Sequence, residues 1–175
     1  MTDVSIERCT PPQWQRFRDL RLRALADAPN AFWQTYAEES AHGEKVWRDR
    51  LADGSRVTLI AVRGGGDVGV TTVGSPTWDD DAEPGSYDLG GFWVAPQARR
   101  TPVARQLLDA AVAVAVDAGA TSLSLWVIGD NPAAERLYAR SGFERSERAG
   151  EMPGRPGTAV RQMVLRLAAA GGDQR

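Results

Sequence analysis

The chain has 175 residues, of which 42% are hydrophobic and 25% are charged, and its formal net charge is −2. This length predicts a single domain over residues 1–175, with its core at about 3–168 and a flexible tail at 169–175. The near-neutral charge argues against nucleic-acid binding, and one cysteine and one histidine, Cys9 and His42, provide neither a disulfide nor a His/Cys cluster for a metal.

The first half of the chain predicts a strand, two helices and a hairpin. These elements are expected at 4–8, from Thr10 to before Pro29, at 38–51, and at 56–62 with 68–74. Thr10 and Gln13 have the spacing of a capping box at a helix start. Gly43 weakens the helical pattern of the second helix.

The second half predicts alternating strands and helices. They are expected at 87–94, 102–118, 121–127, 131–141, 143–146 and 160–167. This order indicates an α+β, three-layer fold with a mixed, mostly antiparallel central sheet flanked by helices. The N-terminus lacks a signal peptide pattern, and the longest aliphatic run, Ala110–Val116, is far too short to span a membrane. We therefore expect a cytoplasmic protein without a membrane partner.

The segment after the strand at 87–94 predicts an anion site at a helix start. The first turn of a helix leaves N–H groups without intrahelical partners and carries partial positive charge. Arg99 and Arg100 precede this turn and Arg105 lies one turn inside it, so cations surround the exposed amides. A pyrophosphate fits such a site, although solvated surface charge is the simpler interpretation of these arginines taken alone.

A second segment predicts a short helix that presents a tyrosine. Asn131 is a natural N-cap with Pro132 at the first helical position, and Gly142 suits the residue that ends a helix. Asn131, Ala134 and Tyr138 are three and four residues apart, so they share one helix face. The small side chain of Ala134 lets a slender ligand lie close to that face.

Together the two segments resemble the acyl-CoA-binding motifs of the GCN5-related N-acetyltransferase (GNAT) family. The first family motif has Gln or Arg, two variable residues, Gly, one variable residue and Gly or Ala, and it falls on Arg99, Pro102 and Ala104. The more specific second motif is matched by Asn131, Ala134, Tyr138, Gly142 and Phe143. Pro102 stands where the family usually has glycine, which removes one N–H donor.

This resemblance implies the GNAT fold and transfer of an acetyl group from acetyl-CoA, a co-substrate, to a primary amine by direct attack. The acceptor would be a small molecule or a peptide amine, and no metal is implied. The implied cofactor-binding residues are Trp93, Val94, Arg99, Arg100, Thr101, Pro102, Val103, Ala104, Arg105, Asn131 and Ala134. The N–H of Val94 would polarise the thioester carbonyl. Asn131 is as well explained by capping its helix.

Tyr138 is the implied general acid for the departing thiolate, and an aromatic that fills a gap between helix and sheet is the alternative. Asp88, which precedes the cofactor strand, is a candidate base, as are Glu38, Glu39 and His42. An acidic loop at 79–83 could attract a cationic amine. Each of these charged residues is also explained as ordinary solvated charge.

Two other functions stay open. Pro102 is compatible with an acyl-CoA-binding regulatory module without turnover, and the same scaffold could serve as a structural or interaction domain with an empty anion site. The sequence identifies neither the acceptor amine nor the oligomeric state, so a homodimer also stays open.

Overall fold

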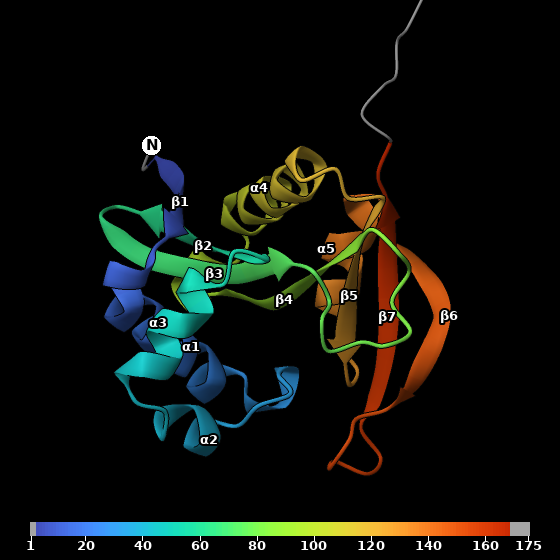
Figure 1. The fold of residues 1–175 in the computed structure, drawn as a ribbon, viewed down its shortest axis with the longest axis horizontal. Coiled ribbons are helices and arrows are strands. Elements are labelled where there is room, and N and C mark those ends of the chain that lie inside the picture. Colours follow the sequence, from blue (N-terminus) through green and yellow to red (C-terminus); the bar gives the residue numbers. More distant parts are fainter. Residues whose placement is uncertain (1–2, 169–175) are drawn as a thin grey trace, which may run out of the picture.

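The fold is built on a seven-stranded mixed sheet with the order β1-β2-β3-β4-β5-β7-β6 (Figure 1). The computed structural model describes residues 3–168, and the predicted tail at 169–175 lies outside them. The strands are β1 Val4–Cys9, β2 Arg56–Arg63, β3 Gly66–Gly74, β4 Ser86–Val94, β5 Ser122–Ile128, β6 Glu144–Glu151 and β7 Ala159–Arg166. Among residues 3–168, only β4 and β5 pair in parallel and the other neighbouring strands are antiparallel, which confirms the predicted fold class.

Helices cover both faces of this sheet. They are α1 Trp14–Asp27, α2 Tyr36–Ser40, α3 Glu44–Ala52, α4 Val103–Asp117 and α5 Pro132–Arg140, with short 3-10 turns η1 Pro11–Gln13, η2 Pro29–Ala31 and η3 Pro96–Ala98. In Figure 1, α4 lies on one side of strands β1 to β4, and α1, α2 and α3 lie on the other. Within residues 3–168, no helix combines the length and the apolar character needed to cross a membrane.

The single helix predicted at 38–51 is wrong, because two helices occupy this region. The Thr35 hydroxyl accepts the Glu38 N–H at 3.2 Å, and the Glu38 carboxylate accepts the Thr35 N–H at 2.7 Å. This capping box starts α2 at Tyr36, before the predicted start. Gly43 then adopts an extended backbone conformation as the N-cap of α3, which separates the two helices.

Strand β4 pairs with β5 over only a short stretch. Three parallel pairs join them, the last between Asp88 and Ser124, and beyond it β4 diverges from β5 (Figure 1). On the other side, β4 pairs with β3 from Asp88 to Val94, but the register shifts by one residue, because Val70 pairs with Trp93 and Thr72 with Gly90. This β-bulge contains Gly91, whose φ of +62° favours glycine. β4 therefore has two parts: a closed half, residues 86–88, which pairs with β5, and an open half, residues 89–94, which does not.

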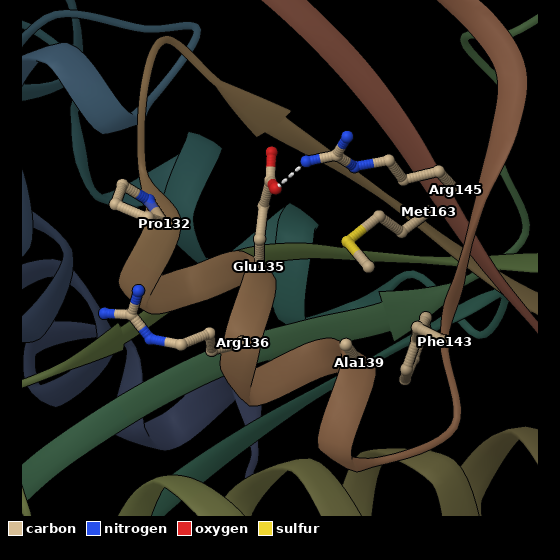
Figure 2. A pocket seen from close by; sticks show the side chains of 7 residues that line it. All are labelled: Pro132, Glu135, Arg136, Ala139, Phe143, Arg145 and Met163. Atoms are coloured by element: carbon tan, nitrogen blue, oxygen red, sulfur yellow. Dashed lines mark hydrogen bonds and ion pairs between the residues drawn. The ribbon is translucent and has the colours of Figure 1, made fainter.

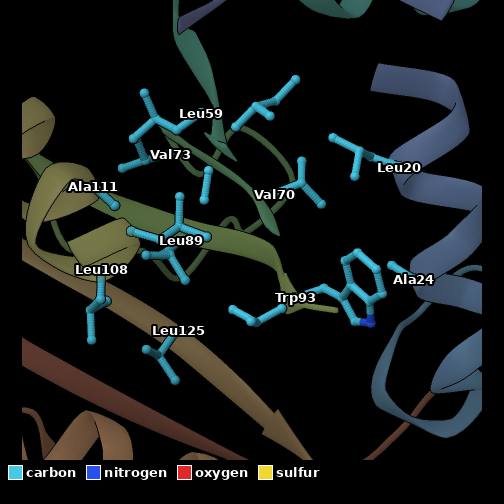
Figure 3. Packing of buried hydrophobic residues seen from close by; sticks show 14 of the residues in the cluster. Leu20, Ala24, Leu59, Val70, Val73, Leu89, Trp93, Leu108, Ala111 and Leu125 are labelled. Atoms are coloured by element: carbon cyan, nitrogen blue, oxygen red, sulfur yellow. The ribbon is translucent and has the colours of Figure 1, made fainter. Parts of the chain in front are cut away.

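The core fixes the open half of β4 between helices. Figure 3 shows Leu108 and Ala111 of α4 on one side of the strands and Ala24 of α1 on the other, with the Trp93 ring extending toward α1. Trp93 is 5% exposed, and its indole N–H donates to the Asp27 carboxylate at 2.9 Å. Burying a large apolar side chain contributes about 1.5–3 kcal/mol. The backbone after the bulge is therefore held in place from both faces of the sheet.

Candidate functional site

The N–H of Val94 faces the opening between β4 and β5. Hydrogen bonds alternate along an antiparallel ladder, and the Ala95 N–H donates to Val68 O at 2.8 Å. Val94, paired with Gly69, therefore directs its N–H and C=O away from β3. Its carbonyl accepts from Arg99 Nε at 3.1 Å, whereas its N–H is positioned to bind a ligand in the opening.

Tyr138 brings α5 against the open half of β4. Its ring lies 5.9 Å from the Phe92 ring of β4 in an edge-to-face arrangement and 5.8 Å from the Phe143 ring. Burial raises the pKa of the Tyr138 hydroxyl above its ordinary value, so the group stays protonated at neutral pH. A protonated phenol beside the Val94 strand can donate a proton there.

The start of α4 presents backbone amides. Its first intrahelical bond runs from the Gln106 N–H to Pro102 O at 2.9 Å, so the N–H groups of Ala104 and Arg105 precede the helical ladder. Thr101 closes the preceding turn, because its hydroxyl donates to Ala98 O at 2.6 Å. This arrangement is typical of a helix terminus that binds phosphate.

The arginines near this turn differ from the sequence-based expectation. Arg99 makes an ion pair with Asp27 at the end of α1, and Arg105 Nε donates to Asp109 at 2.8 Å along the same helix. Arg100 is exposed and adopts φ +59°, and within residues 3–168 it makes no ion pair. Arg100 is therefore the cation at this turn whose charge the protein does not balance.

Asn131 caps α5, which was one of its two predicted roles; the other was binding the cofactor. Its side-chain oxygen accepts the Ala134 N–H at 3.1 Å. Ala134 is partly buried in the first turn, and Tyr138 follows one turn later on the same helix. The structure thus brings the second motif onto one short helix beside the open half of β4.

Asp88, the candidate base, is held in a buried ion pair in the closed half of β4. Its two carboxylate oxygens accept from Arg56 at 2.9 and 3.3 Å, and the residue is 5% exposed. Val94 lies six residues further along the strand, which corresponds to about 20 Å. The structure therefore separates Asp88 from the Val94 amide.

The other base candidates also have structural partners. The carboxylate of Glu39, 2% exposed, accepts from Arg50 at 2.6 Å. Glu38 belongs to the α2 capping box, where the hydrogen bond from the Thr35 backbone lowers its pKa. The backbone N–H of His42 donates to Glu39 O, and its ring lies 6.4 Å from the Trp47 ring.

The acidic loop at 79–83 is partly neutralised. Both terminal nitrogens of Arg148 donate to the Asp79 carboxylate at 2.8 Å, and these bonds hold the pKa of Asp79 below its usual range. Glu83 is paired in the same way with Arg166, which lowers its pKa. The pairs anchor the loop to β6 and β7 and reduce its field on a cationic amine.

The comparisons with known proteins agree with this arrangement. The model of the acetyltransferase (GNAT) family matches residues 14–143. The chain belongs to the GNAT acetyltransferase family. It is therefore an acyltransferase, and members of this family use acetyl-CoA. Among curated proteins, no match to the sequence is found.

Solved structures show the same fold at low sequence identity. A GNAT acetyltransferase from Streptococcus pneumoniae aligns with a TM-score of 0.74 at 19% identity, over 95% of this chain and all of the other. The yncA protein of Salmonella typhimurium, described as an acetyltransferase and solved with its cofactor acetyl-CoA, gives 0.74 at 16%, over 98% of both chains. A ribosomal-protein-alanine N-acetyltransferase from Brucella melitensis gives 0.71 at 22%, over 93% and 99%.

The sequence analysis did not identify three residues that shape the open half of β4 in this GNAT domain. Gly91 forms the bulge, and a Gly-Gly pair inside a predicted strand is a recognisable signal for one. Asp27 accepts from both Trp93 and Arg99. Arg21 is buried beside the bulge, and its signal was its spacing of four residues from both Phe17 and Leu25 on the apolar helix face.

A depression of about 300 Å³ lies between α5 and strands β6 and β7 (Figure 2). It is lined by Pro132, Glu135, Arg136, Ala139, Phe143, Arg145 and Met163. Glu135 makes ion pairs with Arg145 and, at 3.0 Å, with Arg161, so its charge is already balanced. Within residues 3–168, no group of three or more His, Cys, Asp or Glu side chains could hold a metal ion.

Proposed function

We propose that this GNAT enzyme transfers the acetyl group of acetyl-CoA to a primary amine of a small molecule or peptide by direct attack. The observation that carries the proposal is the Val94 N–H, which points into the β4 opening close to the strand position where Phe92 contacts the Tyr138 ring. A donor for the carbonyl oxygen and a proton donor for the leaving thiolate are two groups that assist thioester aminolysis once the amine is neutral.

The residues around this opening fit an acyl-CoA. The amides of Ala104 and Arg105 at the start of α4, together with the Arg100 guanidinium, would hold the diphosphate, and Val103, whose N–H donates to the Thr101 hydroxyl at 3.4 Å, would shape the turn. The unpaired edge of β4 at Val94 would bind an amide of the pantetheine arm, in the manner of an added strand, and Trp93, whose backbone pairs with Val70, would hold this edge in place.

The remaining motif residues would complete the site. Thr101 and Pro102 would shape the phosphate turn, and Arg99 would support it through Val94 O and Asp27. Asn131 and Ala134 would contact the arm from α5. In this proposed site the diphosphate would be bound more by backbone N–H groups than by arginines that lack an ion-pair partner.

The chain's own groups account for the chemistry. In the proposed reaction the neutral amine nitrogen forms a bond to the acetyl carbon, the carbon–sulfur bond breaks, and the proton that the nitrogen loses passes through solvent to replace the one that Tyr138 donates. Val94 N–H would stabilise the negative charge that develops on the carbonyl oxygen. The Tyr138 hydroxyl would give its proton to the departing thiolate. We assign no base role to Asp88, because Arg56 and burial hold its carboxylate in the closed half of β4.

Calorimetry with acetyl-CoA and a thiol-release assay over a panel of amines test this proposal. Cys9, the sole cysteine, gives a low background, because it is buried and burial raises the pKa of its thiol to about 11. We expect saturable binding and amine-dependent thiol release. Binding without thiol release would favour the regulatory module, and no binding at saturating acetyl-CoA would exclude both functions.

A further inference from the structure

Arg21 carries a buried nitrogen without a partner. The residue is 9% exposed, and its Nη1 is the buried side-chain atom that lacks a hydrogen bond within residues 3–168. Its Nη2 donates to the Gln34 side chain at 2.9 Å, and the guanidinium carbon lies 4.7 Å from the centre of the Phe32 ring. An unsatisfied buried donor is costly, so its retention points to a binding partner.

The surroundings of Arg21 also carry excess positive charge. The nearest carboxylate, Glu39, lies 3.7 Å from Arg21 Nη2 and 2.6 Å from Arg50 Nη1. One carboxylate is thus shared between two guanidinium groups. Burial lowers the pKa of Arg21 and Glu39 opposes this effect, but an arginine stays protonated at neutral pH. One positive charge is therefore left for an incoming anion.

The unpartnered nitrogen lies against the bulge of β4. A Cβ placed on Gly91 would be 3.3 Å from Arg21 Nη1, so glycine is what leaves room for the guanidinium. The next residue, Phe92, packs on Tyr138. Val94 lies two residues beyond Phe92 and three beyond Gly91, which corresponds to about 7–10 Å along the strand. The excess charge therefore lies within the length of a small molecule from the proposed reaction centre.

The segment that contacts Arg21 also carries an exposed aromatic ring. Phe32 and Gln34, which contact Arg21, flank Trp33 in the sequence. Trp33 is 37% exposed and lies 6.3 Å from the ring of Trp78, which is 53% exposed and belongs to the β3–β4 loop. The loop that binds Arg21 through Phe32 and Gln34 therefore also presents apolar surface to solvent.

We propose that Arg21 binds a carboxylate of the acceptor, so that the acceptor is an amine that also carries a carboxylate, of the α-amino acid class. This inference rests on the proposed transferase function and specifies its substrate. A peptide carbonyl could also accept from Nη1, but it would leave the excess charge unbalanced. The carboxylate satisfies both the donor and the charge.

Matched acceptors test the proposal. Thiol release is measured with L-phenylalanine, L-leucine and L-methionine and with the carboxamide of each, on the wild type and on Arg21→Gln, Arg21→Lys and Arg18→Gln. Arg18 is the control, because it lies on the same helix and its side chain makes only a 3.6 Å ion pair with Asp19. Comparing ratios between enzymes cancels the different basicity of the two amines.

We expect Arg21→Gln to lower kcat/KM for the amino acids by about 10- to 100-fold and to leave the carboxamides within about threefold. Arg21→Lys keeps the positive charge but not the planar guanidinium, so its kcat/KM for the amino acids should lie between those of the wild type and Arg21→Gln. Arg18→Gln should match the wild type. An unchanged acid-to-amide ratio in both Arg21 variants would overturn the proposal, as would a wild type that prefers the carboxamides.

A binding measurement separates this inference from the transferase proposal. Thermal shift with N-acetyl-L-phenylalanine and with its carboxamide is recorded on the wild type and the folded variants, without turnover. Stabilisation by the acid alone, lost in Arg21→Lys or Arg21→Gln, supports the carboxylate site even if no amine releases thiol. Equal shifts with acid and amide in the wild type reject the site even if thiol release is observed.

Discussion

The closed and open halves of β4 differ in how completely their polar groups are paired. In the closed half, β4 pairs with β5, Asp88 also pairs with Gly74 of β3, and Arg56 balances the buried Asp88 carboxylate. In the open half, within the part of the chain that the structure describes, Val94 lacks a neighbouring strand on one side and Arg21 Nη1 lies unpartnered beside Gly91. Paired groups stabilise the fold, whereas unpaired groups at a structurally fixed position are available to a ligand.

This contrast predicts that substitutions in the two halves have separate effects. Changes near the open half should alter catalysis or binding with little loss of stability. Changes in the closed half should alter the free energy of unfolding and leave the chemistry of the folded protein intact.

Tyr138→Phe should have the largest catalytic effect. Removing the proton donor should lower kcat by about 10²- to 10⁴-fold, while the affinity for acetyl-CoA stays nearly constant. Steady-state kinetics and calorimetry measure the two quantities. Tyr87→Phe, in the closed half of β4, is the matched control and should keep kcat. An unchanged kcat in Tyr138→Phe would leave Tyr138 with a packing role only.

Asp88→Ala should instead destabilise the fold. Removing one partner of a buried ion pair leaves Arg56 uncompensated and costs about 3 kcal/mol of unfolding free energy. Urea denaturation measures this loss, and Arg56→Ala should show a comparable one. The kcat of the folded Asp88→Ala protein should stay within a few-fold of the wild type. A large fall in kcat at normal stability would restore Asp88 as the base.

Pro102→Ala should strengthen cofactor binding. The substitution restores an N–H at the start of α4, where Pro102 already has helical backbone angles that alanine also adopts. One added bond to a charged phosphate should tighten acetyl-CoA by up to about tenfold in calorimetry. Pro96→Ala, at the start of η3, is the control for general proline loss. Weaker binding in Pro102→Ala would show that the ring, not the missing donor, matters there.

Alkaline pH should produce the smallest effect. Burial raises the pKa of Tyr138, so its neutral form contributes stability that is complete below the unfolded value of about 10 and is lost as pH rises above it. The difference in unfolding free energy between wild type and Tyr138→Phe should therefore shift against the wild type between pH 9 and 11. Urea denaturation at several pH values measures it, and a constant difference would contradict burial of the hydroxyl.

Much of the fold could be predicted because its signals are local. The Asn131 cap and the Gly142 stop bounded α5, and the Gly-rich turn at 64–66 marked the β2–β3 hairpin. The start of α2 also had a local signal, the Thr35 to Glu38 capping box, which was not used, and Gly43 marked the break before α3. Gly90 and Gly91 likewise indicated the bulge.

The site could be predicted only in outline. Its motifs marked α4, α5 and the cofactor strand, but not which charges would be free. Arg99 pairs with Asp27, which is 72 residues away in the sequence, and Asp88 pairs with Arg56, which is 32 residues away. Such pairs form only when distant segments pack, so no local pattern reveals them.

The amino-acid sequence by itself determined the order of elements, the helix ends and the family motifs, because each depends on residues a few positions apart. The tertiary structure alone decided that β4 leaves β5 after Asp88, that Arg99 and Arg105 are neutralised, and that Arg21 keeps an unpartnered nitrogen beside Gly91. The physical reason is that burial and charge balance depend on which distant segments share the same space.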